Sequence, residues 1–403
     1  LRREGPLERA LSAQTGTLGT QLAVRVLFVM TDATRPPAPH RRTRVPVWDN
    51  ARFACVTLVV IGHGIQRLTG DSDAALGVYL FIYAFHMPAF AIISGYFSKA
   101  SPPSSRQMKK VLTDIVLPYA IMETIWSGVQ FLVEGSTSLN PTTPHWTLWF
   151  LLALAVFRLI LPYLVLLRWP LVWCVAFSVG VGYLSNVDNT FSLARSIGIL
   201  PFFFLGWQVR QWKLVDRWRL MDARAWWLRV VAVAIFAAWA AVVFPFIGVW
   251  RSIDLKYWFF YDDSYNGIGQ DAWWAGLIRL GFILLAALLS AALFVLIPRK
   301  KTWFTRFGQA TMYIYLLHSF VLYPIRQSGI LGDEHSSLVW LIGMIIFGIV
   351  VSIVLATPFV RRVFRPLIEP KPQWLFLRLD GPNSADPIPR GASHVDPTGS
   401  RRN

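Results

Sequence analysis

The chain has 403 residues, of which 55% are hydrophobic and only 15% are charged, and its mean hydropathy is +0.46. This composition is too apolar for a soluble domain of this size and is typical of a polytopic membrane protein. The net charge of +17 could suggest a nucleic-acid partner, but most Lys and Arg residues lie in short loops between apolar segments and in the tails. That distribution favours membrane topology, so we expect a lipid bilayer and no nucleic acid as partner.

The first 46 residues, 1–46, are expected to form a disordered basic tail. The part that follows Met30 is rich in Pro and Arg and includes RRTR at 41–44. The apolar stretch within 1–29 is too short to span a bilayer and has no convincing cleavage site. We therefore expect translation to start at Met30 and 1–29 to be an upstream extension.

Ten apolar segments follow and predict an all-α integral membrane domain over 47–365 with about ten transmembrane helices. They are 50–69, 77–97, 111–133, 146–167, 170–185, 195–210, 228–250, 273–297, 308–326 and 337–360. Loops on the side of the N-terminal tail hold most of the Lys and Arg, whereas several Asp residues lie in the opposite loops. By the positive-inside rule, both termini are expected in the cytoplasm. The last part, 366–403, is rich in Pro, Ser, Gly and Asp and is expected to be a disordered tail.

Ionisable residues lie deep in three of these segments. Arg52 is near the cytoplasmic end of the first, where its side chain can extend to the interface. His63 lies eleven residues further on, ~16 Å deeper, near the middle of the membrane. In the second segment Pro88 should kink the helix and free a backbone carbonyl near His86. Because His318 in the ninth segment is at a similar depth, we expect three histidines in one layer.

Two further charged residues lie at or near this depth, Glu123 in the third segment and Arg158 in the fourth. A single membrane histidine is usually an interhelical hydrogen-bond partner, but three of them with a glutamate favour a functional polar cavity. There a neutral imidazole could act as a general base, and a carboxylate could hold its tautomer. No metal site is expected, because the histidines are single and on separate segments, without an i,i+4 His pair or a Cys cluster.

Four stretches resemble the multipass membrane acyltransferase-3 family. In WDNARFACVTLVVIGHG, ten residues separate Arg52 from His63, as in the family's Arg/Lys-x10-His signature. The others are FIYAFHMPAFAIISGYF at 81–97, HWTLWFLLAL at 145–154 and MYIYLLHSFVL at 312–322. Each is weak alone, but together, in this order and on a ten-helix frame, they are quite specific. The stretches SGYFSK and YIYLLH look closest to the fucose 4-O-acetylase-like branch.

The resemblance implies an O-acyltransferase of the cell membrane that moves an acyl group, expected to be acetyl, from cytoplasmic acyl-CoA to a hydroxyl. The acceptor would be a sugar, a polysaccharide or a natural product. Acyl-CoA, expected as acetyl-CoA, would be the donor substrate, and no tightly bound cofactor is expected. Its phosphates need cationic contacts near the inner face, which Arg52, Lys109 and Lys110 could supply. The two lysines could equally serve membrane topology alone.

In this interpretation His63 would either take the proton from the acceptor hydroxyl or carry the acyl group covalently. His86 or Glu123 would orient it, and these three form the candidate catalytic set. His318 and Arg158 are assigned to the same cavity. The aromatic residues Trp149 and Tyr313 could line the acceptor path, although aromatic residues on helices more often serve packing.

The main alternative is a proton-coupled exporter of a polar metabolite, since mid-membrane His and Glu residues also suit a proton relay. Transporters commonly contain paired repeats with matching broken helices, and none is evident in the sequence. A third possibility is a structural or sensory membrane protein whose histidines only join helices. It predicts that His63→Ala changes stability but no activity.

Overall fold

The computed structural model describes residues 44–102, 104–135, 142–145, 147–187, 190–221, 226–331 and 337–376. From Pro46 onward these residues belong to one compact unit. Most of the two expected tails, including the proposed extension 1–29, lies outside the described residues.

The described chain is all-helical, with no strand among the described residues. Its first helices are α2 (Pro46–Ile65), α3 (Asp73–Tyr83), α4 (His86–Tyr96), α5 (Ser105–Val111), α6 (Leu117–Glu134), α7 (Trp149–Leu164), α8 (Pro170–Gly180) and α9 (Leu193–Gln211). They are followed by α10 (Leu214–Leu220), α11 (Trp226–Val243), α12 (Ile247–Ser252), α13 (Ala275–Leu296), α14 (Thr311–Gln327), α15 (Leu338–Leu355) and α16 (Pro358–Ile368). A π-helical turn, Leu112–Val116, joins α5 to α6 in one continuous rod.

Several of these helices fit a membrane. Within the described residues six are long and apolar enough to cross it: Asp73–Tyr96, Ser105–Glu134, Thr190–Gln211, Trp226–Val243, Ala275–Leu296 and Leu338–Leu355. Along α11 and α15 many large apolar side chains are exposed, as expected of a surface that faces lipid. Each of the ten predicted segments overlaps a helix, so the all-helical membrane architecture is confirmed. Ten crossings and cytoplasmic termini remain predictions.

The second predicted segment is broken in the middle. A proline has no N–H and clashes with the carbonyl four residues earlier, so Pro88 is tolerated only in the first turn of a helix. Accordingly α3 ends at Tyr83, and α4 restarts at His86, two residues before the proline. The break places the His86 imidazole beside the end of α3, where Nδ1 lies 3.0 Å from the carbonyl oxygen of Ile82.

The C-terminal boundary of the membrane part lies further along the chain than expected. The sequence predicts a disordered tail from residue 366, but α16 continues to Ile368 and a 3-10 turn follows at Gln373–Leu375. Arg361, Arg362 and Arg365 lie among apolar residues in α16, so the end of the predicted membrane domain is an amphipathic helix that continues past residue 365.

Two glycines let α4 and α9 pack backbone to backbone. A Cβ atom on Gly95 would lie 1.8 Å from the carbonyl oxygen of Phe203, and one on Gly206 would lie 1.9 Å from that of Ile92. Both distances are far below van der Waals contact, so only glycine permits this approach. The contact fixes the position of α4, which begins at His86, relative to α9.

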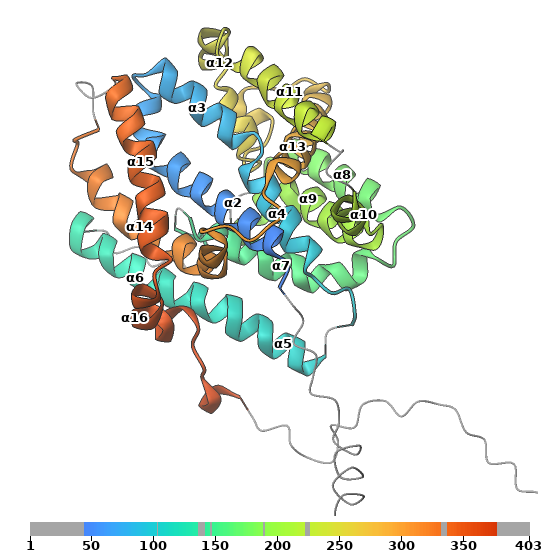
Figure 1. Ribbon diagram of the computed structural model, residues 1–403, viewed down its shortest axis with the longest axis vertical. Coiled ribbons are helices and arrows are strands. Elements are labelled where there is room, and N and C mark those ends of the chain that lie inside the picture. Colours follow the sequence, from blue (N-terminus) through green and yellow to red (C-terminus); the bar gives the residue numbers. More distant parts are fainter. Residues whose placement is uncertain are drawn as a thin grey trace, which may run out of the picture. The chain divides into compact units, whose positions relative to one another are not determined.

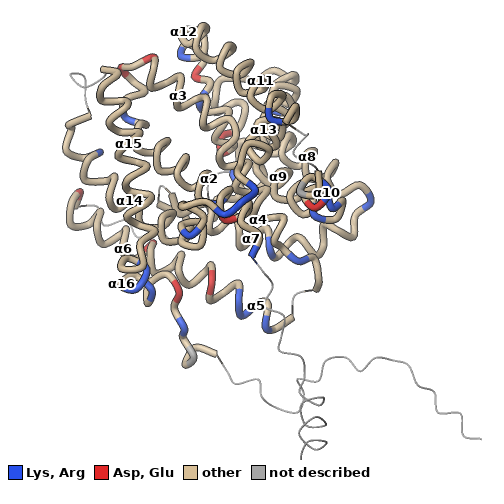
Figure 2. The backbone as a smooth tube through the Cα atoms, in the orientation of Figure 1, with Lys and Arg blue, Asp and Glu red and all other residues tan. Residues whose placement is uncertain are grey.

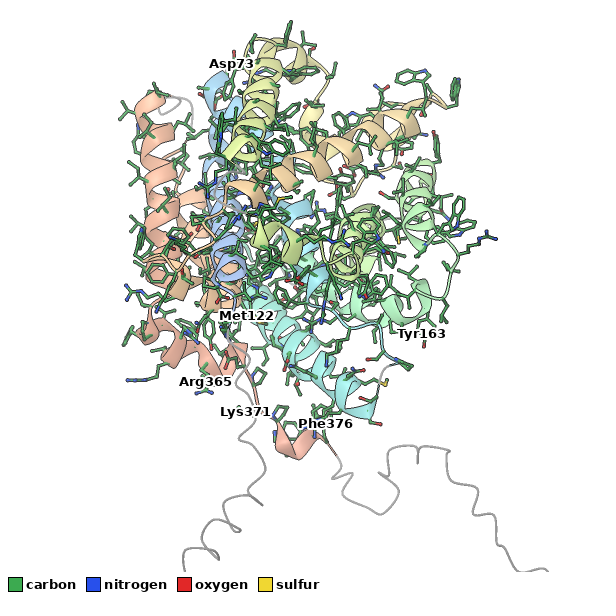
Figure 3. The ribbon with its side chains drawn as sticks, turned by 45° about the vertical axis from the view of Figure 1, so that its right-hand side comes forward. Asp73, Met122, Tyr163, Arg365, Lys371 and Phe376 are labelled. Carbon is green, nitrogen blue, oxygen red and sulfur yellow. The ribbon has the colours of Figure 1, made fainter. Side chains whose placement is uncertain are left out.

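The helices surround α2, which lies at the centre of Figure 1 and contacts α4, α14 and α15. Figure 3 places Asp73 at one end of this helical body and Arg365, Lys371 and Phe376 at the other. Figure 2 shows Lys and Arg gathered on α5 and α16 at that second end. This basic end is the one that the positive-inside pattern assigns to the cytoplasm.

Candidate active site

His63 and His86 line the same cavity, which has a volume of about 310 Å³. His63 comes from α2, and His86 comes from the first position of α4. Trp149, at the start of α7, lines the cavity too, as the sequence analysis allowed. The structure therefore brings together two histidines and an aromatic residue that are far apart in the sequence.

The hydrogen bond of His86 defines its tautomer. A carbonyl oxygen can only accept, so Nδ1 must carry the proton that it donates to Ile82. In the neutral ring Nε2 is then an acceptor with a free lone pair. Such a nitrogen can accept a proton from a hydroxyl group in the cavity.

His318 packs against His63. The centroids of the two imidazole rings are 5.5 Å apart, with an interplanar angle of 36°. His318 is fully buried, and its Nδ1 lies 3.1 Å from the carbonyl oxygen of Ile314. Its Nε2 has no hydrogen-bond partner among the described residues. The ring thus supports His63 from the protein interior, and it is absent from the described lining of the cavity.

A residue to which the sequence analysis gave no role, Arg195, also lines the cavity. Its guanidinium forms an ion pair with the buried carboxylate of Asp262 and lies 4.9 Å from the ring of Trp149. The signal that could have singled out Arg195 is the position of this cation at the very start of the apolar segment 195–210.

Glu123 is not brought to this cavity, which corrects its assignment as the group that orients His63. Its carboxylate bonds instead to the Nδ1 of His145 and accepts the backbone N–H of the same residue at 3.2 Å. Nε2 of His145 lies 2.6 Å from Oε1 of Gln130, two turns further along α6. The position of Glu123 along its segment predicts its depth in the membrane, but depth does not decide which face of the helix a side chain occupies.

The Glu123–His145 pair still bears on the cavity through the loop that it holds. Thr143, Pro144 and Thr147 lie on either side of His145 and line the cavity. Glu123 therefore acts as a positioning residue for this wall. His145 was quoted in a motif but received no role, because its partner lies 22 residues away in the sequence.

Three basic residues from three helices line a second cavity of about 380 Å³: Arg52 from α2, Lys110 from α5 and Arg158 from α7. Nη1 of Arg52 lies 3.1 Å from Oδ1 of Asp49, and its guanidinium lies 4.4 Å from the ring of Phe97. These contacts hold Arg52 in place. The cavity suits an anion, because its cations outnumber the single described carboxylate in its lining, Asp114.

A third cavity, of about 270 Å³, continues this basic region. It shares Phe97, Lys110 and Arg158 with the second cavity and adds Lys99. Together the two cavities extend a positively charged surface from the α4–α5 loop to Arg52.

Two of the predicted residues point elsewhere. Nζ of Lys109 lies 4.6 Å from the ring of Phe376, and Lys109 is absent from the described lining of both basic cavities. Neighbouring helix residues are ~100° apart around the axis, so Lys110 can face the cavity while Lys109 does not. Tyr313 likewise lies against α16, with the guanidinium of Arg361 5.8 Å from its ring.

Tyr315 lines both the histidine cavity and the cavity of Arg52. It lies two residues beyond Tyr313 and therefore on roughly the opposite face of α14. Its hydroxyl donates to the carbonyl oxygen of Thr147. Phe150 lines the cavity of Arg52, and its neighbour Trp149 lines the histidine cavity. The two cavities therefore share a wall of aromatic side chains.

No group of three His, Cys, Asp or Glu side chains is placed to hold a metal ion within the described part of the chain. The side chains that line the histidine cavity offer imidazole, guanidinium and hydroxyl groups. These groups can accept a proton and stabilise negative charge.

A protein-family comparison gives this arrangement its context. The family model described as an acyltransferase domain, Acyl_transf_3, matches residues 45–357, which include all three cavities and all but the end of the described membrane part. No match was found among curated proteins or among solved structures. The chain belongs to the acyltransferase-3 family of membrane acyltransferases.

Proposed function

We propose that this protein transfers an acyl group, most simply acetyl, from cytoplasmic acyl-CoA to a hydroxyl group of a sugar, polysaccharide or natural product. Within the family we place it nearest the fucose 4-O-acetylase-like branch, in the cell membrane. The motifs SGYFSK and YIYLLH favour this branch.

One observation carries the proposal: a basic cavity and a histidine cavity meet at Tyr315. Acyl-CoA has the matching shape, because an anionic nucleotide is joined by a long neutral arm to a thioester. Arg52, Lys110 and Arg158 would bind the phosphates through charge-assisted hydrogen bonds. The arm would then pass the aromatic wall and deliver the thioester carbonyl to His63.

In the direct mechanism the acceptor hydroxyl lies between the thioester and an imidazole. The ring nitrogen of His63 takes the hydroxyl proton as the oxygen attacks the carbonyl carbon. The carbon–sulfur bond of the tetrahedral intermediate then breaks, and the CoA thiolate leaves and recovers the proton. Arg195 is placed to stabilise negative charge that develops in the cavity.

Two other assignments fit the same residues. In one, His63 attacks the thioester itself and carries the acyl group as an acyl-imidazole before passing it to the acceptor. In the other, His86 supplies the base through Nε2, and His63 orients the thioester or the acceptor. The first two assignments need His63 as the reacting group, and the third needs both imidazoles at the cavity.

The decisive experiment measures release of free CoA thiol by the purified protein in lipid, with acetyl-CoA and a panel of sugar acceptors. We expect His63→Ala to lower turnover by about 10²–10⁴-fold, the range for loss of a general base. Thermal unfolding of the variant would check that it is folded. A folded His63→Ala variant with normal turnover would refute the proposed role of His63.

The donor site is tested by a pair of neighbouring lysines. Lys110→Gln removes a cation from the basic cavities, whereas Lys109→Gln removes the same charge from a side chain that faces Phe376. We expect the KM for acetyl-CoA to rise several-fold in the first variant only. An equal rise of KM in both variants would show that the lysines act through the overall positive charge of this surface and not through a contact with the donor. Movement of a polar metabolite without any thiol release would instead support the transporter.

A further inference from the structure

A separate cavity of about 440 Å³ lies among α2, α4, α9, α10, α11 and α13 and shares no described lining residue with those discussed above. Its walls are almost entirely apolar and include Ala51 from α2, Leu205 from α9, and Ala291 and Phe294 from α13. The volume is within the range of about 300–1,000 Å³ that is typical of small-molecule sites. Its chemistry suits a hydrocarbon chain.

Trp218, in the wall of this cavity, and its neighbour Arg299 each have a buried hydrogen-bond donor without an acceptor among the described residues. Trp218 lines the cavity, and the guanidinium of Arg299 lies 4.1 Å from its ring. Nη1 of Arg299 donates to the carbonyl oxygen of Met221 at 3.1 Å. Nε1 of Trp218 and Nε of Arg299 are both buried, and neither has a partner among the described residues. Buried donors without an acceptor are costly, so a ligand that supplies oxygen atoms would stabilise them.

Positive charge is concentrated in the same region. Arg217 is the one charged residue in the described lining of the cavity. Burial lowers the pKa of Arg299, and the nearby charge of Arg229 lowers it further. Within the described chain none of Arg217, Arg229 and Arg299 forms an ion pair with a carboxylate. Among the described residues no carboxylate offsets these charges, so this part of the cavity suits an anion.

We propose that this cavity binds an anionic glycerophospholipid of the surrounding membrane. One acyl chain would occupy the apolar cavity, and the phosphate would lie between Arg217 and Arg299. The indole N–H of Trp218 would donate to a phosphate or ester oxygen of the lipid. The site is independent of the proposed acyl transfer.

Membrane topology alone does not account for these contacts. The positive-inside rule needs only exposed basic residues in loops, whereas Arg299 is held against an indole and a carbonyl with its Nε buried. Free phosphate would leave the apolar cavity empty. Basic pockets between membrane helices on the cytoplasmic side are established binding sites for anionic lipid headgroups. The loops that hold Arg217 and Arg299 are the ones predicted to be cytoplasmic.

Native mass spectrometry of the full chain in detergent would test the proposal, with phosphatidylglycerol and phosphatidylcholine of identical acyl chains and with glycerol phosphate as a chain-free probe. We expect at least tenfold tighter binding of phosphatidylglycerol than of phosphatidylcholine, the effect of about one charge-assisted hydrogen bond. The double variant Arg217→Gln/Arg299→Gln should lose this preference. The control Lys301→Gln/Arg306→Gln removes the same charge from exposed residues further along the α13–α14 connection and should keep the preference.

The apolar part is tested by Ala291→Phe, which fills the cavity and should weaken both lipids by about tenfold while thermal unfolding stays cooperative. If the double arginine variant does not fold, Trp218→Phe removes only the N–H donor and should weaken phosphatidylglycerol selectively. Three results would overturn the proposal: equal loss of preference in the control, lipid binding unchanged by Ala291→Phe or Trp218→Phe, or glycerol phosphate binding as tightly as phosphatidylglycerol.

Discussion

The break between α3 and α4 determines the tautomer of His86. The restart of α4 before Pro88 lets the imidazole bond to the carbonyl of Ile82. That bond holds the proton on Nδ1 and leaves Nε2 as an acceptor at a cavity that His63 also lines. The two ring nitrogens therefore have separate tasks: Nδ1 donates a hydrogen bond to the backbone, and Nε2 is available at the cavity.

Two amide substitutions separate these tasks. His86→Asn places an NH₂ group near the position of Nδ1, so it can still donate to Ile82 but has nothing at the position of Nε2. In the assignment that makes His86 the base, we expect a folded protein whose turnover falls by about 10²–10⁴-fold. His86→Gln leaves the backbone bond unmade and should lower the free energy of unfolding by about 0.5–1.5 kcal/mol. Thiol release and thermal unfolding, measured together, check both expectations, and an active Asn variant would assign His86 to structure alone.

Glu123 acts at the same scale, through His145. Both oxygens of its buried carboxylate bond to that residue. Glu123→Ala should therefore lower the free energy of unfolding by about 1–3 kcal/mol, because it leaves donors of His145 without an acceptor. Turnover should fall as the wall formed by Thr143 and Thr147 loosens.

A double-mutant cycle with His145→Ala distinguishes this explanation from a direct role at His63. Residues that act as a pair give strongly non-additive effects on both stability and turnover. If the effects of Glu123→Ala and His145→Ala on turnover were additive, Glu123 would act separately from His145.

At the scale of helices, the contact of α4 with α9 positions His86 and Arg195, which belong to these two helices and line the same cavity. Gly95→Ala would place a methyl group at 1.8 Å from a backbone oxygen that cannot move aside alone, so the two helices must separate. We expect a loss of about 1–3 kcal/mol in the free energy of unfolding, together with lower turnover.

The matched control is Gly128→Ala in α6, where nothing lies within 4 Å of the added Cβ. This change should be neutral or stabilising by up to ~1 kcal/mol, since alanine favours helix more than glycine does. Thermal unfolding in one detergent compares the two variants directly. Similar melting temperatures for both would mean that the α4–α9 approach is not required for stability.

Helix faces also explain which parts of the site could be predicted. The rise per residue is constant, so counting from helix ends placed His63, His86 and His318 at one depth, and the structure brings them together. Counting does not show which neighbours a face will meet. The sequence predicts Lys109 together with Lys110, and Tyr313 in place of Tyr315, but Lys110 and Tyr315 are the ones that line the cavities. Arg195 and His145 depend on partners distant in sequence, which periodicity cannot identify.

At the scale of the whole molecule, the two cavities imply a direction. The basic cavities lie toward α5, whereas the histidine cavity is lined by residues from the loop before α7 and the loop before α13. If ten helices cross the membrane, these loops lie on the side opposite α5. Donor and acceptor would then approach the shared wall at Tyr315 from opposite faces of the membrane. The number of crossings therefore decides whether the two substrates come from opposite sides.

Three single cysteines distinguish ten crossings from the six long apolar helices alone. Ser101→Cys lies in the α4–α5 loop, Arg168→Cys in the α7–α8 loop and Asn266→Cys between α12 and α13, and all three positions are exposed. The native Cys55 and Cys174 are buried and should give little background. With ten crossings, positions 101 and 168 lie inside and 266 outside, whereas with six crossings position 168 shares the side of 266. An impermeant maleimide applied to intact cells should therefore label only Asn266→Cys, and labelling of Arg168→Cys before permeabilisation would contradict the ten-helix topology.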